Sequence, residues 1–402
     1  MDKTLGLACN ISTGKLDANQ AVSGGEYPFF TCAEFPDQID HFAYDDDVVL
    51  VAGNNARGNF HVSRYKGKFN AYQRTYILTA KEGFNIDYIY YALKLELKRL
   101  REKSQGSQTK FLTMPILTGI HLSDVTGDEQ TEIASVLSTI DKKIELNNRI
   151  NAELEAMAKT LYDYWFVQFD FPDANGKPYK ASSGKMVYND TLKREIPEGW
   201  SASNILSVAN LLGGGTPSKS KEEYWNGHIP FFTPSDSDNN VFSIETESYI
   251  TDLGLEKSST RLFEKNTVFI TARGSVGRLA LNSVPMAMNQ SCYALKPKNG
   301  ISFSFLFYLT KELIHHLEVK ASGSVFNSIV SNDIEFTNLA LPDDKTIIER
   351  FAEMAEPIFK HIEIATLENK QLSSQRDWLL LMLMNGQVTV KPKTESQEAQ
   401  HG

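Results

Sequence analysis

Tyr27-Pro28-Phe29-Phe30-Thr31 returns as Ile229-Pro230-Phe231-Phe232-Thr233 in the second half of this 402-residue chain. Two shorter patterns also recur in the same order, both after 217 residues: Gln73-x-x-Tyr76 returns as Gln290-x-x-Tyr293, and Gly106-Ser107 returns as Gly323-Ser324. Recurrence in a fixed order is the sequence signature of a repeated architecture. The sequence therefore predicts one structural plan that is used twice.

The first part of each copy is predicted to be an α+β domain. Short runs of β-branched and aromatic residues, such as Asp47-Val48-Val49-Leu50-Val51 and Thr267-Val268-Phe269-Ile270, are typical of strands. Residues 87–102 and 302–318 carry apolar side chains at three- and four-residue steps, which predicts short helices. We place the two domains at residues 1–124 and 200–341.

The second part of each copy is predicted to be a long helix, within residues 125–165 and 342–385. Apolar residues recur there every seven positions, as in a coiled coil. The predicted seam consists of Ile133, Ile140, Asn147, Leu154 and Leu161 in the first helix and Phe351, Ile358, Leu372 and Leu379 in the second. A second row of the first helix, three residues further on, consists of Val136, Lys143, Ile150, Met157 and Tyr164.

Polar residues interrupt both helical patterns. Asn147 and Asn369 either face the partner helix, where a polar residue fixes the register, or face water. Residues 166–199 join the two copies and are rich in Pro, Gly, Asn and Ser, which predicts a connector. The polar residues 386–402 are expected to form a disordered tail.

Composition limits the possible functions. The chain has 41 Lys and Arg against 50 Asp and Glu, a net charge of −9, and three scattered cysteines. No leader or membrane-spanning run is evident, so we expect a cytoplasmic protein without disulfides. The net charge argues against nucleic-acid binding, but residues 57–110 alone carry 12 basic and 4 acidic side chains. Local charge, rather than the total, attracts a polyanion.

The common catalytic motifs are absent from the sequence. There is no phosphate-binding loop, no base-methylation tetrad, no nucleophile elbow and no zinc-protease helix. Gly213-Gly214-Gly215-Thr216 is interpreted as a turn, and the acidic run Asp45-Asp46-Asp47 as a charged turn rather than a magnesium site. His315-His316 is not expected to bind metal, because adjacent helical side chains point apart. We predict no catalytic residue, no metal and no bound cofactor.

The remaining polar loops suit DNA binding, since Arg pairs with guanine and Asn or Gln with adenine. Loops with Asn and Arg beside Gly follow a predicted strand in both copies, although a polar hairpin without function has the same composition. The predicted DNA contacts are Asn54, Asn55, Arg57, Asn59, Arg64, Lys66, Lys68, Ser107, Gln108 and Lys110 in the first copy, and Thr233, Arg273, Ser275, Arg278, Asn289, Gln290, Ser324 and Asn327 in the second.

These motifs together resemble the specificity subunit of type I restriction-modification systems, over nearly the whole chain. The resemblance rests on the first pattern quoted above and on Asp47 to Asn54, Gly213-Gly-Gly-Thr-Pro217, Tyr224-Trp225-Asn226-Gly227, Thr271-Ala-Arg-Gly-Ser-Val-Gly277, Asn289-Gln290, Ala321-Ser-Gly-Ser324 and the connector from Trp165 to Trp200. The family's Leu-Pro-x-x-x-Glu-Gln signature is incomplete at both helix starts, at Gly127-Asp128-Glu129-Gln130 and at Leu341-Pro342-Asp343-Asp344-Lys345.

The resemblance implies a non-catalytic DNA-reading subunit. Each of the two target-recognition domains would read one part of a split, non-palindromic site on double-stranded DNA, and the two helices would pack antiparallel. Two methyltransferase subunits would dock on them with S-adenosylmethionine, and restriction subunits would supply ATP and magnesium chemistry. A self-contained DNA methyltransferase or nuclease, and a coiled-coil adaptor without DNA binding, stay as alternatives.

Overall fold

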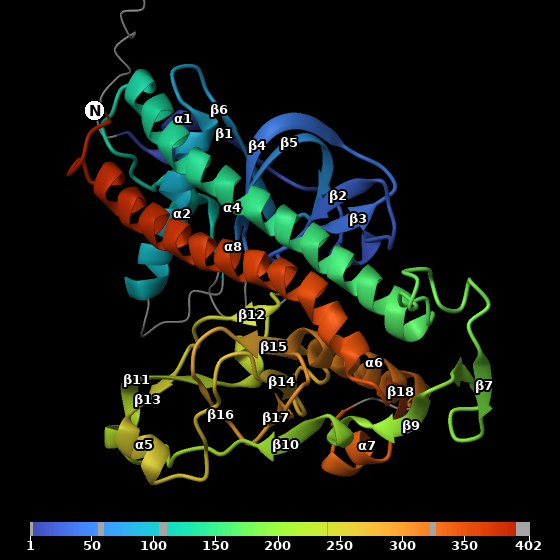
Figure 1. The fold of residues 1–402 in the computed structure, drawn as a ribbon. Helices are drawn as coiled ribbons and strands as arrows, with labels where there is room; N and C mark the ends of the chain where they lie inside the picture. Colours follow the sequence, from blue (N-terminus) through green and yellow to red (C-terminus); the bar gives the residue numbers. More distant parts are fainter. Residues whose placement is uncertain (1–2, 55–59, 104–110, 239, 322–326, 391–402) are drawn as a thin grey trace, which may run out of the picture. The chain divides into compact units, whose positions relative to one another are not determined.

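The computed structural model describes residues 3–54, 60–103, 111–238, 240–321 and 327–390. Its contacts divide the chain into two units (Figure 1). The first unit combines Met1–Ile144 with Gln371–Gly402, and the second is Glu145–Lys370. Each unit therefore contains one of the two predicted domains together with part of both long helices.

The first unit is built on a six-stranded sheet with the order β1-β6-β4-β5-β2-β3. β4 lies inside the sheet and is buried continuously from Val48 to Ala52, which explains its unbroken apolar sequence. All neighbours are antiparallel except β2 and β5. The strands are β1 (Cys9–Thr13), β2 (Tyr27–Phe30), β3 (Asp37–Ile39), β4 (Tyr44–Ala52), β5 (Val62–Ala71) and β6 (Thr75–Ala80).

Helix α2 (Ile86–Lys103) covers this sheet. Its buried Tyr88, Ile89 and Leu93 share one apolar core with Val49 of β4 and Leu78 of β6. Ile89 and Leu93 are four residues apart, which places them on one face of the helix, and Tyr88 directly precedes Ile89. Two short helices, α1 (Leu5–Ala8) and α3 (Met114–Thr118), pack against each other beside this core.

The second unit repeats this plan with more strands, which are divided among separate sheets. A five-stranded sheet has the order β10-β17-β14-β15-β12, and a three-stranded sheet has the order β13-β11-β16. The strands are β9 (Trp200–Asn204), β10 (Ala209–Gly213), β11 (Trp225–Phe232), β12 (Phe242–Ser243), β13 (Tyr249–Ile250), β14 (Val268–Thr271), β15 (Leu279–Asn282), β16 (Ala287–Met288), β17 (Cys292–Pro297) and β18 (Asn338–Pro342).

The helices of the second unit occupy the corresponding places. The main helix α6 (Phe303–Lys320) is almost fully apolar on its inner side and begins at the N-cap Ser302. The shorter α5 (Asp252–Glu256) packs beside β11 and β13, and α7 (Ser331–Glu335) packs beside the helical turn Ile205–Ser207. β9 pairs antiparallel with β18, so the two ends of the domain lie side by side. The predicted connector contains a hairpin of β7 (Met186–Asn189) and β8 (Arg194–Pro197).

The predicted repeat is confirmed, and it is visible in one strand pairing that both units share. In the first unit Phe29 and Phe30 of β2 pair in parallel with Asn70 and Ala71, and in the second unit the matching pairs are Phe231 with Ala287 and Phe232 with Met288. Parallel pairing between these short strands is an unusual feature in sheets that are otherwise mostly antiparallel. Its recurrence at matching positions shows that the sequence pattern marks one fold used twice.

Two long helices, α4 (Gly127–Tyr162) and α8 (Thr346–Met384), complete the fold. Thr126 and Glu129 form a reciprocal cap at the start of α4: the Glu129 carboxylate accepts from the Thr126 amide at 2.7 Å, and the Thr126 hydroxyl oxygen accepts from the Glu129 amide at 3.2 Å. This capping box fixes the start of the helix without the proline of the family signature. Asp344 caps α8 by accepting from the Thr346 amide at 2.9 Å.

Burial differs between the two predicted rows of α4, and Leu137 and Ala158, which the sequence pattern adds to the apolar stripe, are buried. Ile133 and Asn147 are buried, whereas Ile150 and Met157 are 43% and 60% exposed. The buried row that accompanies the seam lies four residues after it, at positions such as Leu137 and at Ala158. The reason is that both helices also pack into the domain cores, so that their buried face follows the helical period of 3.6 rather than a strict heptad.

Asn147 and Asn369 face each other, which settles the choice between seam and water. In the second unit the Asn147 side-chain amide donates to Asn369 Oδ1 at 2.9 Å and to Glu368 Oε2 at 2.7 Å. One turn away, Asn151 donates to Thr366 at 3.3 Å. Residue numbers rise on one helix as they fall on the other, so the helices are antiparallel, as predicted.

The same orientation holds in the first unit. There Arg376 of α8 donates to Asp141 of α4 at 2.7 Å, and Tyr91 of α2 donates to the same carboxylate at 2.6 Å. Beyond α8 the backbone amide of Gln387 donates to the Met382 carbonyl at 2.9 Å. Of the tail predicted to be disordered, residues 386–402, the structure describes 386–390, and residues 391–402 lie outside the described residues.

Candidate nucleic-acid interface

Three loops meet at one place in the first unit. The amide of Gly53, just after β4, donates to the carbonyl of Arg74 in the β5–β6 turn at 2.8 Å. The carbonyl of Gly53 accepts from the amide of Leu112, which follows the α2 helix, at 2.9 Å. Asn54 forms a single bridge with Phe111 beside these bonds. A strand end, a tight turn and a post-helix loop are thus held together by the backbone.

The second unit repeats this arrangement bond for bond. The amide of Ala272 donates to the Ser291 carbonyl at 2.9 Å, and the amide of Ile329 donates to the Ala272 carbonyl at 2.9 Å. Arg273 and Ser328 form the bridge that Asn54 and Phe111 form in the first unit. The predicted loops of each copy are therefore brought together by the fold. Predicted contacts Asn55, Arg57, Asn59, Ser107, Gln108, Lys110 and Ser324 lie outside the described residues.

The glycine cluster packs against the β-turn of the second site. A Cβ on Gly214 would lie 2.1 Å from the Asn289 carbonyl oxygen and 2.4 Å from that of Met288. Gly214 is therefore required for close approach of two backbone segments, and its role is packing rather than phosphate binding. Next to it, Thr216 donates to the side chain of the exposed Gln290.

Several predicted contacts of the second unit are partly used within the protein. Thr233 caps the short turn Pro234–Asp236 through a reciprocal bond with Asp236. Asn289 accepts from the Ser291 amide at 3.0 Å, and Arg278 donates to the Ser237 carbonyl at 2.8 Å. The Ser275 carbonyl accepts from the Thr271 hydroxyl. These groups shape the loops, whereas the side chains of Arg273 and Asn327 are exposed, as is that of Gln290 beside Thr216.

The three basic residues of β5 differ in their surroundings. Arg64 is 21% exposed, pairs with Asp47 and Asp87, and donates to the carbonyls of Val48 and Tyr65 at 3.2 and 2.9 Å. We therefore assign Arg64 to holding β4, β5 and α2 together. Lys66 is 78% exposed. Lys68 lies 4.6 Å from the ring centre of the exposed Phe42. Both lysines are better placed than Arg64 to reach a phosphate.

The sequence reasoning missed one pair at the first site. The guanidinium of Arg74 lies 5.9 Å from the ring centre of Phe111, whose side chain is 54% exposed. A guanidinium stacked on an exposed aromatic ring suits contact with nucleic acid, because the guanidinium and the ring can each contact a base or a sugar. The sequence did offer a signal for this pair: Arg74 directly follows the recurring Gln73, and Phe111 lies shortly after the recurring Gly106-Ser107.

In the part of the chain that the structure describes, no group of three or more His, Cys, Asp or Glu side chains could hold a metal ion. Burial raises the pKa of the Cys9 and Cys292 thiols to about 12, which leaves both without nucleophilic thiolate at neutral pH. None of the described helices is long and apolar enough to cross a membrane.

A framework that presents the same three-loop surface twice, with different side chains, defines a two-site recognition protein. Residues 1–156 and 197–374 match the family model described as type I restriction modification DNA specificity domain. The chain therefore belongs to the type I restriction-modification DNA specificity family.

Named relatives agree with this family. The chain is 27% identical to the type I restriction enzyme EcoDI specificity subunit of Escherichia coli, over 98% of this chain and 89% of that protein. It is 28% identical to the MjaIX specificity subunit of Methanocaldococcus jannaschii, over 77% and 71%. The crystal structure of the S subunit from M. genitalium covers 96% of both chains with a TM-score of 0.58 and 16% identity, a likeness of fold.

Proposed function

We propose that this chain is the non-catalytic, DNA-reading subunit of a type I restriction-modification complex, and that it reads a bipartite, non-palindromic site. The observation that carries the proposal is the repeated three-loop framework with unlike side chains: Asn54 against Arg273, and Phe111 against Ser328. Because a base edge is recognised by side-chain chemistry, two matching frameworks with different side chains should read two different sequences.

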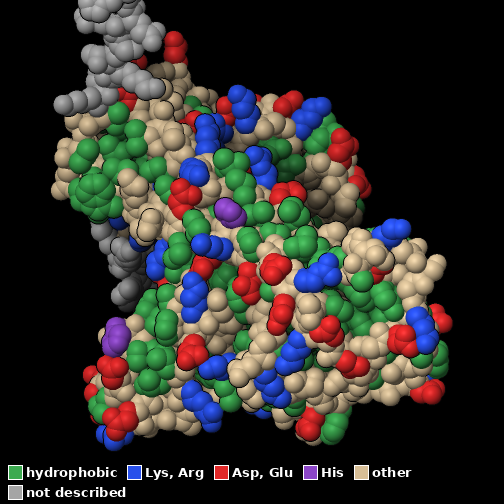
Figure 2. Space-filling model, viewed as in Figure 1, with side chains coloured by type: hydrophobic (Ala, Val, Ile, Leu, Met, Phe, Trp, Pro, Cys, Tyr) green, Lys and Arg blue, Asp and Glu red, His purple; other side chains and the backbone are tan. Residues whose placement is uncertain are grey.

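The surface charge of the chain favours tight DNA binding only in the assembled complex. Lys and Arg side chains are interspersed with Asp and Glu over the face seen in Figure 2, without a broad field of one sign. On the first domain Asp47 pairs with Arg64 and lies 3.4 Å from Lys66, which reduces the positive charge of β5. Phosphate contacts dominate DNA affinity. We expect weak binding by the isolated chain and tight binding once partner subunits enclose the duplex.

The exposed row of α4 is a suitable docking surface for a partner helix. Leu146, Ile150 and Met157 of α4, and Tyr164 in the helical turn Asp163–Val167 that follows it, lie within the second unit at steps of four and seven residues, and each is at least 37% exposed. Apolar side chains at these steps form one stripe along a helix. We propose that a helix of a methyltransferase subunit covers this stripe. S-adenosylmethionine, ATP and magnesium are then bound by partner subunits.

Exchange of the second domain tests the proposal. Trp200 of β9 is paired with Pro342 of β18, so residues 200–341 enter and leave the fold at neighbouring points and can be replaced as a module. Replacement by the corresponding domain of a relative, followed by methylation mapping with the partner subunits, should change one half of the recognised site. A change in both halves would contradict two independent readers, and methylation by the isolated chain would favour a self-contained enzyme.

A further inference from the structure

The two three-loop sites differ in the chemistry of two matching positions. In the first site the guanidinium of Arg74 lies 5.9 Å from the ring centre of Phe111, and both side chains are exposed. The matching residues of the second site, 217 positions further along the chain, are Ser291 and Ser328. The first site therefore presents a cation and an aromatic ring where the second presents two hydroxyl groups.

The backbone that carries Phe111 is fixed by hydrogen bonds. The next residue, Leu112, is buried, and its amide donates to the Gly53 carbonyl at 2.9 Å. The Leu112 carbonyl accepts from the Tyr76 hydroxyl at 2.8 Å. Phe111 itself forms the bridge with Asn54. The ring, which is 54% exposed, thus projects from a backbone that is held in place and can bear a ligand pressed against it.

The turn that carries Arg74 is held in the same way. The Arg74 carbonyl accepts from the Gly53 amide at 2.8 Å. The hydroxyl of the next residue, Thr75, donates to the carbonyls of Phe30 and Thr31 at 3.1 and 3.2 Å. Among the described residues, no carboxylate pairs with the Arg74 guanidinium. Its charge is therefore available to nucleic acid while the guanidinium lies over the Phe111 ring.

An exposed ring beside a cation suits stacking on a base. Nucleobases stack on aromatic side chains, and these contacts contribute strongly to affinity. In a duplex the faces of the bases are covered by their neighbours, so a ring reaches them only where a base step opens, and Phe is among the residues that proteins insert at such steps. A serine hydroxyl instead contacts base edges by hydrogen bonds, which leaves the bases stacked.

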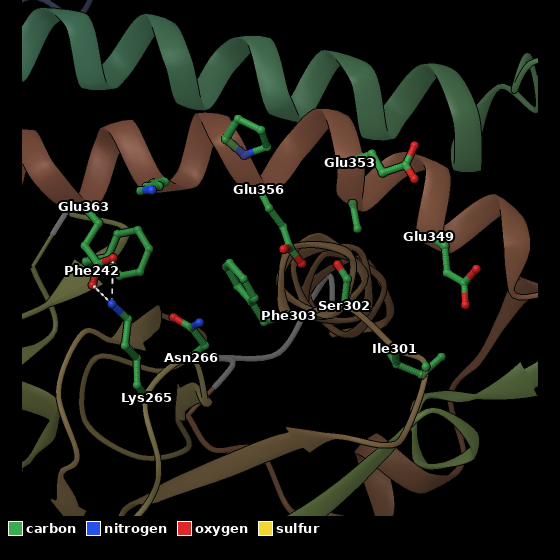
Figure 3. A pocket seen from close by; sticks show the side chains of 14 residues that line it. Phe242, Lys265, Asn266, Ile301, Ser302, Phe303, Glu349, Glu353, Glu356 and Glu363 are labelled. Carbon is green, nitrogen blue, oxygen red and sulfur yellow. Dashed lines mark hydrogen bonds and ion pairs between the residues drawn. The ribbon is translucent and has the colours of Figure 1, made fainter.

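The groove along α8 in the second unit does not offer DNA a comparable surface (Figure 3). It has a volume of about 1050 Å³, and four glutamates and two lysines line it. One of the lysines, Lys265, is already paired with Glu363 at 2.6 Å. Phosphate groups are repelled by such an acidic lining. In this unit the three-loop site, where Arg273 is exposed, is the better place for a duplex.

We propose that the first domain opens one base step of its half-site and stacks Phe111 on the uncovered base, whereas the second domain reads a half-site that stays stacked. The inference rests on the proposed function. Because Arg74 lies over one face of the ring, the base stacks on the other face, and this contact offsets the cost of unstacking. Pyrimidine–purine steps open most easily, so the first half-site should contain one where Phe111 enters.

Fluorescent base analogues in the full complex with its methyltransferase subunits test this inference. Domain exchange first assigns each half-site to its domain. Single bases outside the methylated base pair are then replaced by 2-aminopurine or pyrrolo-cytosine, whose emission is quenched by stacking. We expect emission to rise at least about twofold at one step of the first half-site when the complex binds, and no such rise in the second.

Three variants separate the ring from other sources of unstacking. Phe111→Ala should remove the rise and weaken DNA binding by at least about fivefold. The reciprocal change, Ser291→Arg with Ser328→Phe, should create a rise in the second half-site. Phe336→Ala removes another exposed ring, outside both three-loop sites, and is the control that should change neither emission nor affinity. Unchanged melting temperatures show that the variants fold, since all four side chains lie at least partly at the surface.

The outcomes separate stacking from the proposed function. A wild-type complex without a rise, or a rise that persists in Phe111→Ala, overturns the stacking inference. Equal rises in both half-sites that Phe111→Ala leaves unchanged come from base flipping by the methyltransferase and also overturn it. Weaker binding by Phe111→Ala with unchanged emission assigns the ring to a groove contact instead. A complex without preference for a bipartite site contradicts the proposed function itself.

Discussion

Replacement of Arg64 by alanine separates a structural role from a DNA-binding role at the first domain. The guanidinium joins Asp47 of β4 to Asp87 of α2 and donates to two backbone carbonyls. Alanine removes all four partners at once, which leaves Asp87 without its cation and Asp47 with only Lys66 at 3.4 Å. The substitution should therefore destabilise the first unit rather than change DNA contacts selectively.

The size of the effect follows from the exposure of the partners. Charge-assisted hydrogen bonds contribute about 1.5–3 kcal/mol each, but exposed ion pairs contribute only about 0.2–1 kcal/mol. The side chains of Asp47 and Asp87 are 40% and 45% exposed, so the contribution of each ion pair to stability should lie between these two limits. We expect a loss of about 2–3 kcal/mol in total. For a unit of this size that corresponds to a fall of roughly 5–10 °C in melting temperature.

The assay combines thermal unfolding with hydrogen exchange. Arg64→Ala should lower the melting temperature and speed exchange of the amides that pair β4 with β5. Lys66→Ala, on the same strand but 78% exposed, is the matched control and should change the melting temperature by less than about 2 °C. Unchanged stability of Arg64→Ala, together with weaker DNA binding by the assembled complex, would refute the structural role.

Two further predictions concern the loops and the helix pair. Arg57→Ala with Lys110→Ala should flatten the salt dependence of DNA binding by the complex by about two units of log–log slope, and an unchanged slope in a salt titration would favour an adaptor without DNA contacts. Asn147→Ala and Asn369→Ala should each lower the melting temperature, and the double variant should lower it by less than the sum because the two side chains bond to each other. Additive shifts would contradict that coupling.

Much of the fold was accessible from the sequence because matching turns of the two copies keep recognisable residues in the same order. Gln73 and Gln290 mark the same turn in both units, and the backbone bonds beside Arg74 and Ser291 are the same. A tight turn restricts its residues strongly, so matching turns keep matching letters. The antiparallel pairing of α4 with α8 was likewise expected. Asn147 and Asn369 form a polar contact between the two helices.

The remainder depends on packing that periodicity does not encode. The second heptad row of α4 is exposed at Ile150 and Met157 because the domain core, rather than the partner helix alone, decides which face is buried. In the sequence, Arg64 is typical of a DNA contact. Its ion-pair partner Asp87 lies 23 residues further along the chain, so the sequence pattern does not reveal the pair. In the sequence, Gly214 is typical of a flexible turn. The structure shows why glycine is needed there: the carbonyl of Asn289 occupies the place of a Cβ.

Methylation mapping of a host that carries this chain with its partner subunits tests the central claim most directly. Two unlike three-loop sites on one chain predict a single methylated motif made of two different half-sites separated by unspecified bases. Deletion of the gene for this chain should abolish that methylation, because the other subunits would lack a reader. A palindromic or uninterrupted motif, or methylation that persists without this chain, would contradict the account.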